Sequence, residues 1–233
     1  MAETFKTFKL ESEFVVDSCD EKFPTAFYSW SNTSLELSGG GTHFGYIFKG
    51  NSLLKTNLGT FNLREKMFFC VPDNFMIEGG EGIIITRIGF AGMFSVGGQI
   101  EAQGRLRYID GCRDTLLIPP IIKGDPCLNA LYFPKSITQT PHTHPSVRVG
   151  IVAQGNGECV TPSGIFPLNV GQAFVIPPDA LHSFNTYDDE MVVIAYHPDS
   201  DFGATHEDHP MVNKTMVAGI SASKLENIRT KGD

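Results

Sequence analysis

An internal repeat constrains the fold of this 233-residue chain more than any other feature of its sequence. Residues 44–77 align without a gap with residues 149–182, at an offset of 105 positions. The identical pairs include Gly45 with Gly150 and Pro72 with Pro177, residue types that fix the geometry of turns. Turns at the same spacing, with apolar segments between them, predict one β-unit built twice.

Short apolar segments separated by Gly and Pro indicate strands rather than helices. We expect strands at 147–154, 158–161, 172–176 and 191–196, an extra strand at 115–118, and a short helix at 222–228 only. Many short strands at this spacing predict an all-β sandwich or small barrel. The repeat then gives four parts: an N-terminal barrel at 1–96, a connecting segment at 97–128, a C-terminal barrel at 129–210 and a tail at 211–233.

Charge and composition exclude several classes of partner. Lys and Arg number 18 and Asp and Glu 26, a net charge of −8 that disfavours binding to nucleic acid or to an anionic membrane. No stretch approaches the roughly 18 apolar residues of a membrane span. The five cysteines are odd in number and form no CxxC pair, which favours reduced thiols and a cytoplasmic location.

Three histidines in the second repeat carry the chemistry. His142 and His144 are two residues apart, so on a strand both side chains point to the same face. His182 would approach from a neighbouring strand and complete a site for one divalent cation.

At these positions the sequence resembles the cupin superfamily. The first cupin motif, G(x)5HxH(x)3–4E(x)6G, is met by His142, His144 and Gly155, and the second, G(x)5PxG(x)2H(x)3N, by Gly171, Pro177 and His182. The resemblance and the repeat together imply two cupin barrels in tandem, each a double-stranded β-helix or jelly roll. The departures from the motifs are Ser136, Asp179 and Thr186 at turn positions, and Arg148 in place of the glutamate ligand.

The first repeat lacks the metal ligands. The positions equivalent to His142, His144, Arg148 and His182 carry Leu37, Gly39, His43 and Ile77. We therefore expect one divalent metal per chain, in the C-terminal barrel only. Fe(II) is favoured, but imidazole ligands also suit Ni, Zn, Mn and Cu.

Arg148 allows two interpretations. Beside a cation it would clamp the carboxylate of a small anionic substrate, since Arg binds carboxylates bidentately. Alternatively, it forms a structural ion pair with a nearby Asp or Glu. Tyr132 and Tyr196 are candidate wall residues, because a phenol near a metal can donate a proton. A second metal site formed by His197, His206 and His209 is a weaker alternative.

Three functions remain open. Cupins with three histidines and no glutamate resemble thiol and diketone dioxygenases, which implies a non-haem Fe(II) oxygenase acting on a small carboxylate. The second is a redox-neutral isomerase or lyase of a sugar acid or similar metabolite. The third is a non-catalytic small-molecule-binding cupin. A homodimer is a further expectation, because cupin barrels often pair across edge strands, although two barrels in one chain can satisfy that need.

Overall fold

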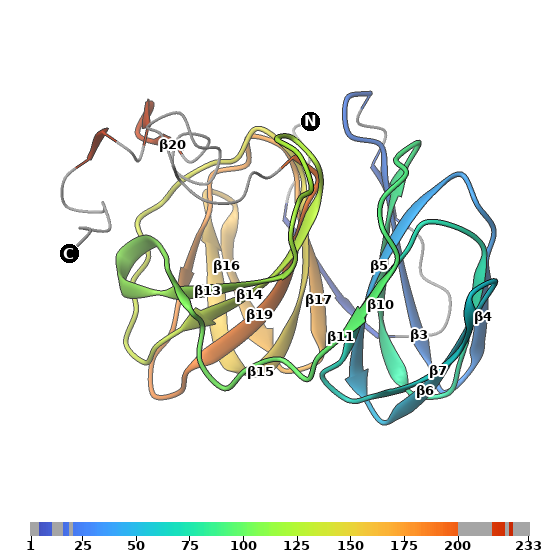
Figure 1. The fold of residues 1–233 in the computed structure, drawn as a ribbon. Coiled ribbons are helices and arrows are strands. Elements are labelled where there is room, and N and C mark those ends of the chain that lie inside the picture. Colours follow the sequence, from blue (N-terminus) through green and yellow to red (C-terminus); the bar gives the residue numbers. More distant parts are fainter. Residues whose placement is uncertain (1–4, 11–15, 19–20, 200–215, 222–223, 226–233) are drawn as a thin grey trace. The chain divides into compact units, whose positions relative to one another are not determined.

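The computed structural model describes residues 5–10, 16–18, 21–199, 216–221 and 224–225 (Figure 1). The chain divides into two compact units, which we call the N-terminal unit (residues 9–101) and the C-terminal unit (residues 1–8 and 102–233). Within the part of the chain that the structure describes, helical structure is limited to short 3-10 turns such as Ile109–Gly111, and no helix is long and apolar enough to cross a membrane. The predicted all-β class is confirmed.

The N-terminal unit contains two antiparallel sheets. In order of hydrogen-bonded neighbours, the six-stranded sheet consists of β11 (Ser95–Gly97), β8 (Phe68–Val71), β5 (Gly41–Lys49), β10 (Glu81–Ile88), β3 (Thr25–Ser31) and β2 (Val16–Ser18). The four-stranded sheet consists of β4 (Ser34–Leu37), β9 (Phe75–Glu78), β6 (Asn51–Thr56) and β7 (Gly59–Arg64). Both sheets contribute side chains to one buried core, which includes Trp30, Ile47, Leu54, Leu63, Phe69 and Ile77.

The C-terminal unit is built around one long strand. Its main sheet follows the order β1 (Lys6–Lys9), β17 (Gln172–Ile176), β15 (Arg148–Thr161), β19 (Met191–His197), β14 (Cys127–Phe133), β13 (Arg113–Ile118) and β12 (Leu106–Arg107). The second half of β15 pairs instead with β16 (Gly164–Asn169) and β18 (Ser183–Asn185). This 14-residue strand therefore connects two groups of strands within the unit (Figure 1). A small hairpin, β20 (Met216–Val217) with β21 (Ile220–Ser221), follows later in the chain.

The repeat in the sequence is present in the backbone pairing. Asn51 of β6 is opposite Arg64 of β7, and 105 positions later Asn156 of β15 is opposite Asn169 of β16. The pairing of β5 with β8 recurs at the same offset in the pairing of β15 with β17. The repeated turns therefore impose the same strand register twice.

Two features differ from the predicted domain boundaries. Strand β1 belongs to the sheet of the C-terminal unit, and the Phe5 ring lies in that unit's core, with its centroid 5.2 Å from Phe166 and 5.9 Å from Phe174. The segment 97–128 supplies β12, the 3-10 turn and β13 to the same unit, so it is structural rather than a connector. Its predicted extra strand is present as β13.

Some sequence predictions lie outside the described residues. His206 and His209 are among them, so the structure does not test a second metal site that includes these histidines. The helix expected at 222–228 also falls almost wholly outside the described ranges.

Candidate metal centre

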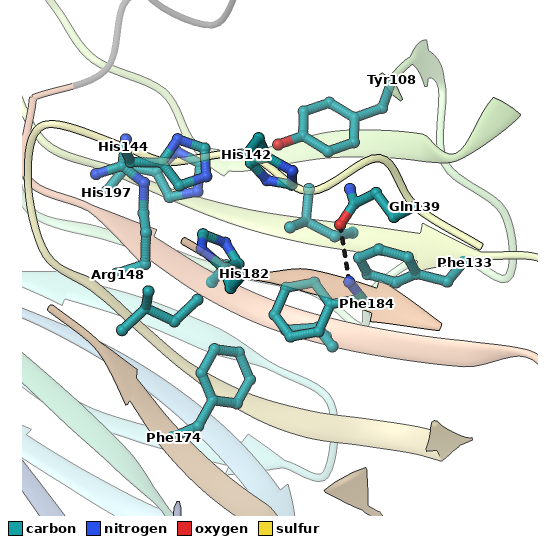
Figure 2. A pocket seen from close by; sticks show the side chains of 14 residues that line it. Tyr108, Phe133, Gln139, His142, His144, Arg148, Phe174, His182, Phe184 and His197 are labelled. Atoms are coloured by element: carbon teal, nitrogen blue, oxygen red, sulfur yellow. Dashed lines mark hydrogen bonds between the residues drawn. The ribbon is translucent and has the colours of Figure 1, made fainter. Parts of the chain in front are cut away.

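The three predicted histidines of the C-terminal unit come together. The backbones of His142 and His182 form an antiparallel bridge, with N–H···O=C distances of 2.9 and 3.0 Å. His144 follows two residues after His142, and one ring nitrogen from each histidine lies within 4.8 Å of those of the other two. All three side chains are buried. Figure 2 shows the three rings grouped at one side of a cavity.

Hydrogen bonds fix the tautomers of two of these rings. Nδ1 of His142 donates to the carbonyl of Thr140 at 2.8 Å, and Nδ1 of His182 donates to the carbonyl of Ala180 at 2.8 Å. A carbonyl only accepts, so each Nδ1 carries the proton and each Nε2 keeps its lone pair. This arrangement orients imidazoles for metal ligation.

Burial keeps the triad neutral at physiological pH. Desolvation lowers the pKa of His142, and it lowers the pKa of His182 to about 3. The pKa of His144 falls well below its usual value, first through burial and second through the positive charge of Arg148. Three neutral, convergent imidazoles form a donor set that fits a divalent cation such as Fe, Ni, Cu or Zn.

The triad borders a partly open cavity with a largely apolar lining. Strand β14 contributes Leu131 and Phe133, and β19 contributes Val193, Ala195 and His197. The other lining residues are Tyr108, Gln139, Arg148, Phe174, Ile176, Phe184 and the three histidines. This lining suits a small ligand with an apolar body and a few polar groups.

Arg148 lines this cavity and is engaged in an ion pair. Its Nη1 lies 3.5 Å from Oδ1 of Asp199 and also donates to Ser146 and to the Val147 carbonyl. Burial lowers the pKa of Arg148, whereas the Asp199 carboxylate raises it. Its Nε is buried without a hydrogen-bond partner among the described residues. The ion pair, one of the two interpretations of Arg148, is therefore present.

The two tyrosines expected in the wall do not line the cavity. Tyr132 lies between the inward-facing Leu131 and Phe133, and Tyr196 lies between Ala195 and His197, so both side chains point to the opposite faces of their strands. Both strands are buried along their whole length, and no alternation of polar and apolar residues in the sequence indicates which face is inner.

Sequence reasoning missed three polar residues of the cavity: Tyr108, Gln139 and His197. The sequence suggests His197 only as part of a tail site, but it ends β19 in phase with Ala195, a signal that strand periodicity provides. Tyr108 and Gln139 belong to irregular segments, where no periodic signal exists.

Apolar side chains occupy the positions of His142 and His182 in the N-terminal unit. Leu37 of β4 is opposite Phe75 of β9, as His142 is opposite His182. Phe75, rather than the predicted Ile77, is therefore the counterpart of His182, because the loop before His182 is two residues longer. His43 occupies the position of Arg148, and its ring packs 5.1 Å from that of Phe75.

Comparisons with known proteins agree with this architecture. Residues 123–208 match the model of the AraC-like ligand binding domain. A search of curated proteins found no match. Many solved structures are similar over most of the chain at low sequence identity, among them the following three.

A cupin 2 conserved barrel domain protein from Leptotrichia buccalis has 15% identity and a TM-score of 0.58, covering 85% of this chain and 90% of that one. The protein Ylba from E. coli has 15% identity and a TM-score of 0.61, with coverage of 84% and 92%. A salicylate 1,2-dioxygenase from Pseudaminobacter salicylatoxidans has 9% identity and a TM-score of 0.61, with 84% of each chain covered. The protein therefore has a cupin fold.

Proposed function

We propose that this protein is a metal-dependent bicupin enzyme of the non-haem Fe(II) dioxygenase type, acting on a small carboxylate in the C-terminal barrel. The observation that carries the proposal is the buried triad of His142, His144 and His182, whose ligand atoms lie within 4.8 Å of one another beside a partly open cavity. Ligand atoms so close together, without a carboxylate among them, suit a cation that keeps open positions for exogenous ligands.

The chain's own residues account for the rest of the site. The carbonyls of Thr140 and Ala180 hold two imidazoles in the ligating tautomer. When bound, an iron ion would supply dioxygen activation and Lewis acidity. Fe(II) is the favoured metal because one structural neighbour is a salicylate 1,2-dioxygenase, and one metal per chain is expected because Leu37 and Phe75 fill the equivalent site of the N-terminal unit.

Arg148 supports a negatively charged substrate. The guanidinium is buried, lines the cavity and is only partly compensated, because Asp199 reaches Nη1 at 3.5 Å while Nε has no partner among the described side chains and backbone groups. A substrate carboxylate would complete the hydrogen bonding of this cation. The apolar walls, with Phe133, Phe174 and Phe184, suit a hydrocarbon or aromatic body.

One observation favours a second candidate, a non-catalytic ligand-binding cupin. Residues 123–208, which contain the entire triad, match the AraC-like ligand binding domain. A redox-neutral isomerase or lyase has less support, because it needs a general base and the candidate tyrosines 132 and 196 lie outside the cavity. Tyr108 is the one phenol in the lining of this cavity, and burial raises its pKa, which makes it a poor base.

Elemental analysis of the protein purified without chelators tests the metal. We expect one equivalent per chain, a loss of that metal in His142→Ala, and no change in His43→Gln, the matched histidine of the N-terminal unit. Dioxygen uptake by the Fe(II)-loaded protein with a panel of small carboxylates then separates the candidates. Carboxylate binding without dioxygen uptake would favour the ligand-binding module, and full metal retention in His142→Ala would refute the triad.

A further inference from the structure

Gln139 occupies the segment between β14 and the first metal-ligand candidate, and its side chain is aimed into the cavity. The residue is only 2% exposed and forms part of the cavity lining. Its backbone N–H donates to the carbonyl of Phe184 at 3.1 Å, which anchors the residue against β18. This hydrogen bond therefore fixes the position of the Gln139 backbone.

The orientation of the Gln139 amide is fixed by a second hydrogen bond. The backbone N–H of Phe184 donates to Oε1 of Gln139 at 3.1 Å, drawn as the dashed line in Figure 2. A backbone N–H only donates, so the amide oxygen must face Phe184 and the NH2 group must face away from it. Figure 2 shows this nitrogen pointing toward Tyr108 and His142.

Tyr108 provides a second donor at the same part of the cavity. Its hydroxyl is directed toward His142 (Figure 2). Burial, with the nearby Asp114 carboxyl as the next cause, raises the pKa of this phenol, so it keeps its proton. Among the described residues, neither the Gln139 amide nitrogen nor the Tyr108 hydroxyl has a hydrogen-bond partner.

Two polar groups with free donor hydrogens at one end of a largely apolar cavity select for an acceptor atom in the ligand. A site built to hydrogen-bond a ligand atom rejects an analogue that lacks it, because the donors then stay unpaired. Arg148 lies on the other side of the triad in Figure 2, near His144 and His197. The cavity thus has a cationic end and a neutral donor end, with the triad between them.

We propose that Gln139, together with Tyr108, forms a specificity subsite that binds a neutral acceptor oxygen of the substrate, such as a carbonyl or hydroxyl oxygen. This inference rests on the proposed function, in which Arg148 receives the carboxylate. The substrate class is then an apolar or aromatic carboxylate that carries a second oxygen function away from its carboxylate. Gln139 is a positioning residue that sets which part of the substrate faces the triad.

Binding measurements with matched probes test the subsite. Isothermal titration calorimetry on the metal-containing protein would compare benzoate with 2-, 3- and 4-acetylbenzoate, whose ketone oxygen only accepts. We expect at least one isomer to bind roughly tenfold more tightly than benzoate, the scale of one hydrogen bond to a buried donor. In Gln139→Glu this preference should fall to within about twofold, because glutamate still accepts from Phe184 N–H but presents oxygen instead of NH2 to the cavity.

The chain offers a matched control for that substitution. Oε1 of Gln172 also accepts from a backbone N–H, that of Asn169 at 3.1 Å, but Gln172 does not line the cavity. Gln172→Glu should therefore leave the ratio of the two affinities unchanged. Thermal unfolding of both variants shows whether either substitution disturbs the fold.

The results separate this subsite from the proposed function. Equal affinities for benzoate and all three isomers, or an unchanged preference in Gln139→Glu, would overturn the subsite even if benzoate binding depends on Arg148. No binding of any probe overturns it as well. The metal content of His142→Ala and the benzoate affinity of the Arg148→Met/Asp199→Asn double variant, which leaves no lone buried charge, test the proposed function separately.

Discussion

Replacing Asp199 with asparagine should destabilise the C-terminal unit by about 3 kcal/mol, because it removes the carboxylate that compensates a buried guanidinium. The Arg148 and Asp199 residues are 6% and 2% exposed, and their atoms Nη1 and Oδ1 are 3.5 Å apart. Breaking a buried ion pair costs about 3–5 kcal/mol. The lower end applies here, because the distance is long and Nη1 keeps three other oxygen partners.

Asparagine preserves another contact of this position, the hydrogen bond from Ser146. Ser146 Oγ donates to Asp199 Oδ1 at 2.7 Å, and an amide oxygen can accept the same bond. The substitution therefore removes mainly the charge. A loss of about 3 kcal/mol corresponds to a decrease in Tm of roughly 6–12 °C for a chain of this size.

The assay can follow the two units separately. Trp30, the single tryptophan of the chain, is buried in the core of the N-terminal unit, so its fluorescence reports on that unit, whereas circular dichroism reports on both. We expect Asp199→Asn to shift the circular-dichroism transition attributable to the C-terminal unit and to strengthen benzoate binding, because Arg148 is then less neutralised. A loss below about 1 kcal/mol in urea titrations, with unchanged benzoate affinity, would refute this account of Arg148.

Three other substitutions test the energetics of the two barrels. Burial raises the pKa of Asp114 from 3.8 to about 7, so the protonated carboxyl stabilises the fold below pH 4. This contribution, up to about 4 kcal/mol, is lost as the pH rises to 7. In urea titrations at pH 5 and 8, Asp114→Asn should therefore make the free energy of unfolding depend less on pH. Burial lowers the pKa of His43 to about 4, so the neutral imidazole stabilises the fold above pH 6.5, and this stabilisation is lost as the pH falls through 4. His43→Leu should remove this acid sensitivity from the unfolding transition followed by Trp30 fluorescence. In Gly150→Ala, the new Cβ would lie 2.6 Å from Cζ of Phe174, and we expect a loss of about 1–3 kcal/mol by chemical denaturation.

The paired glycines show why the repeat is detectable in the sequence. Gly45 and Gly150 each lie opposite a phenylalanine of the neighbouring strand, Phe69 and Phe174, and each would place a Cβ against that ring. Such close approaches require glycine at one position and leave room for an aromatic residue at the other. The glycine and the phenylalanine are therefore required at the same spacing in both repeats, which is why the alignment of the repeats predicts the strand pairing.

The local sequence likewise predicted the triad. Two histidines at strand spacing share a face whatever the rest of the fold does, and the proline-rich turn before His182 indicated a neighbouring strand. The two-residue difference in loop length, however, shifts the counterpart of His182 from Ile77 to Phe75. Only the observed bridge between His142 and His182 shows that shift.

Local sequence patterns thus predict the all-β class, the repeated strand register and the three histidines, because each depends on turn geometry and on the two-residue period of a strand. Which faces of β14 and β19 are inner follows from packing, which excludes Tyr132 and Tyr196 from the cavity and includes His197. The tertiary structure also brings Tyr108 and Gln139 to the site, and Asp199 to Arg148, from segments far apart in the chain. These contacts result from the packing of strands and loops against one another. Strands buried on both faces and irregular segments have no periodic pattern in the sequence that would predict such packing.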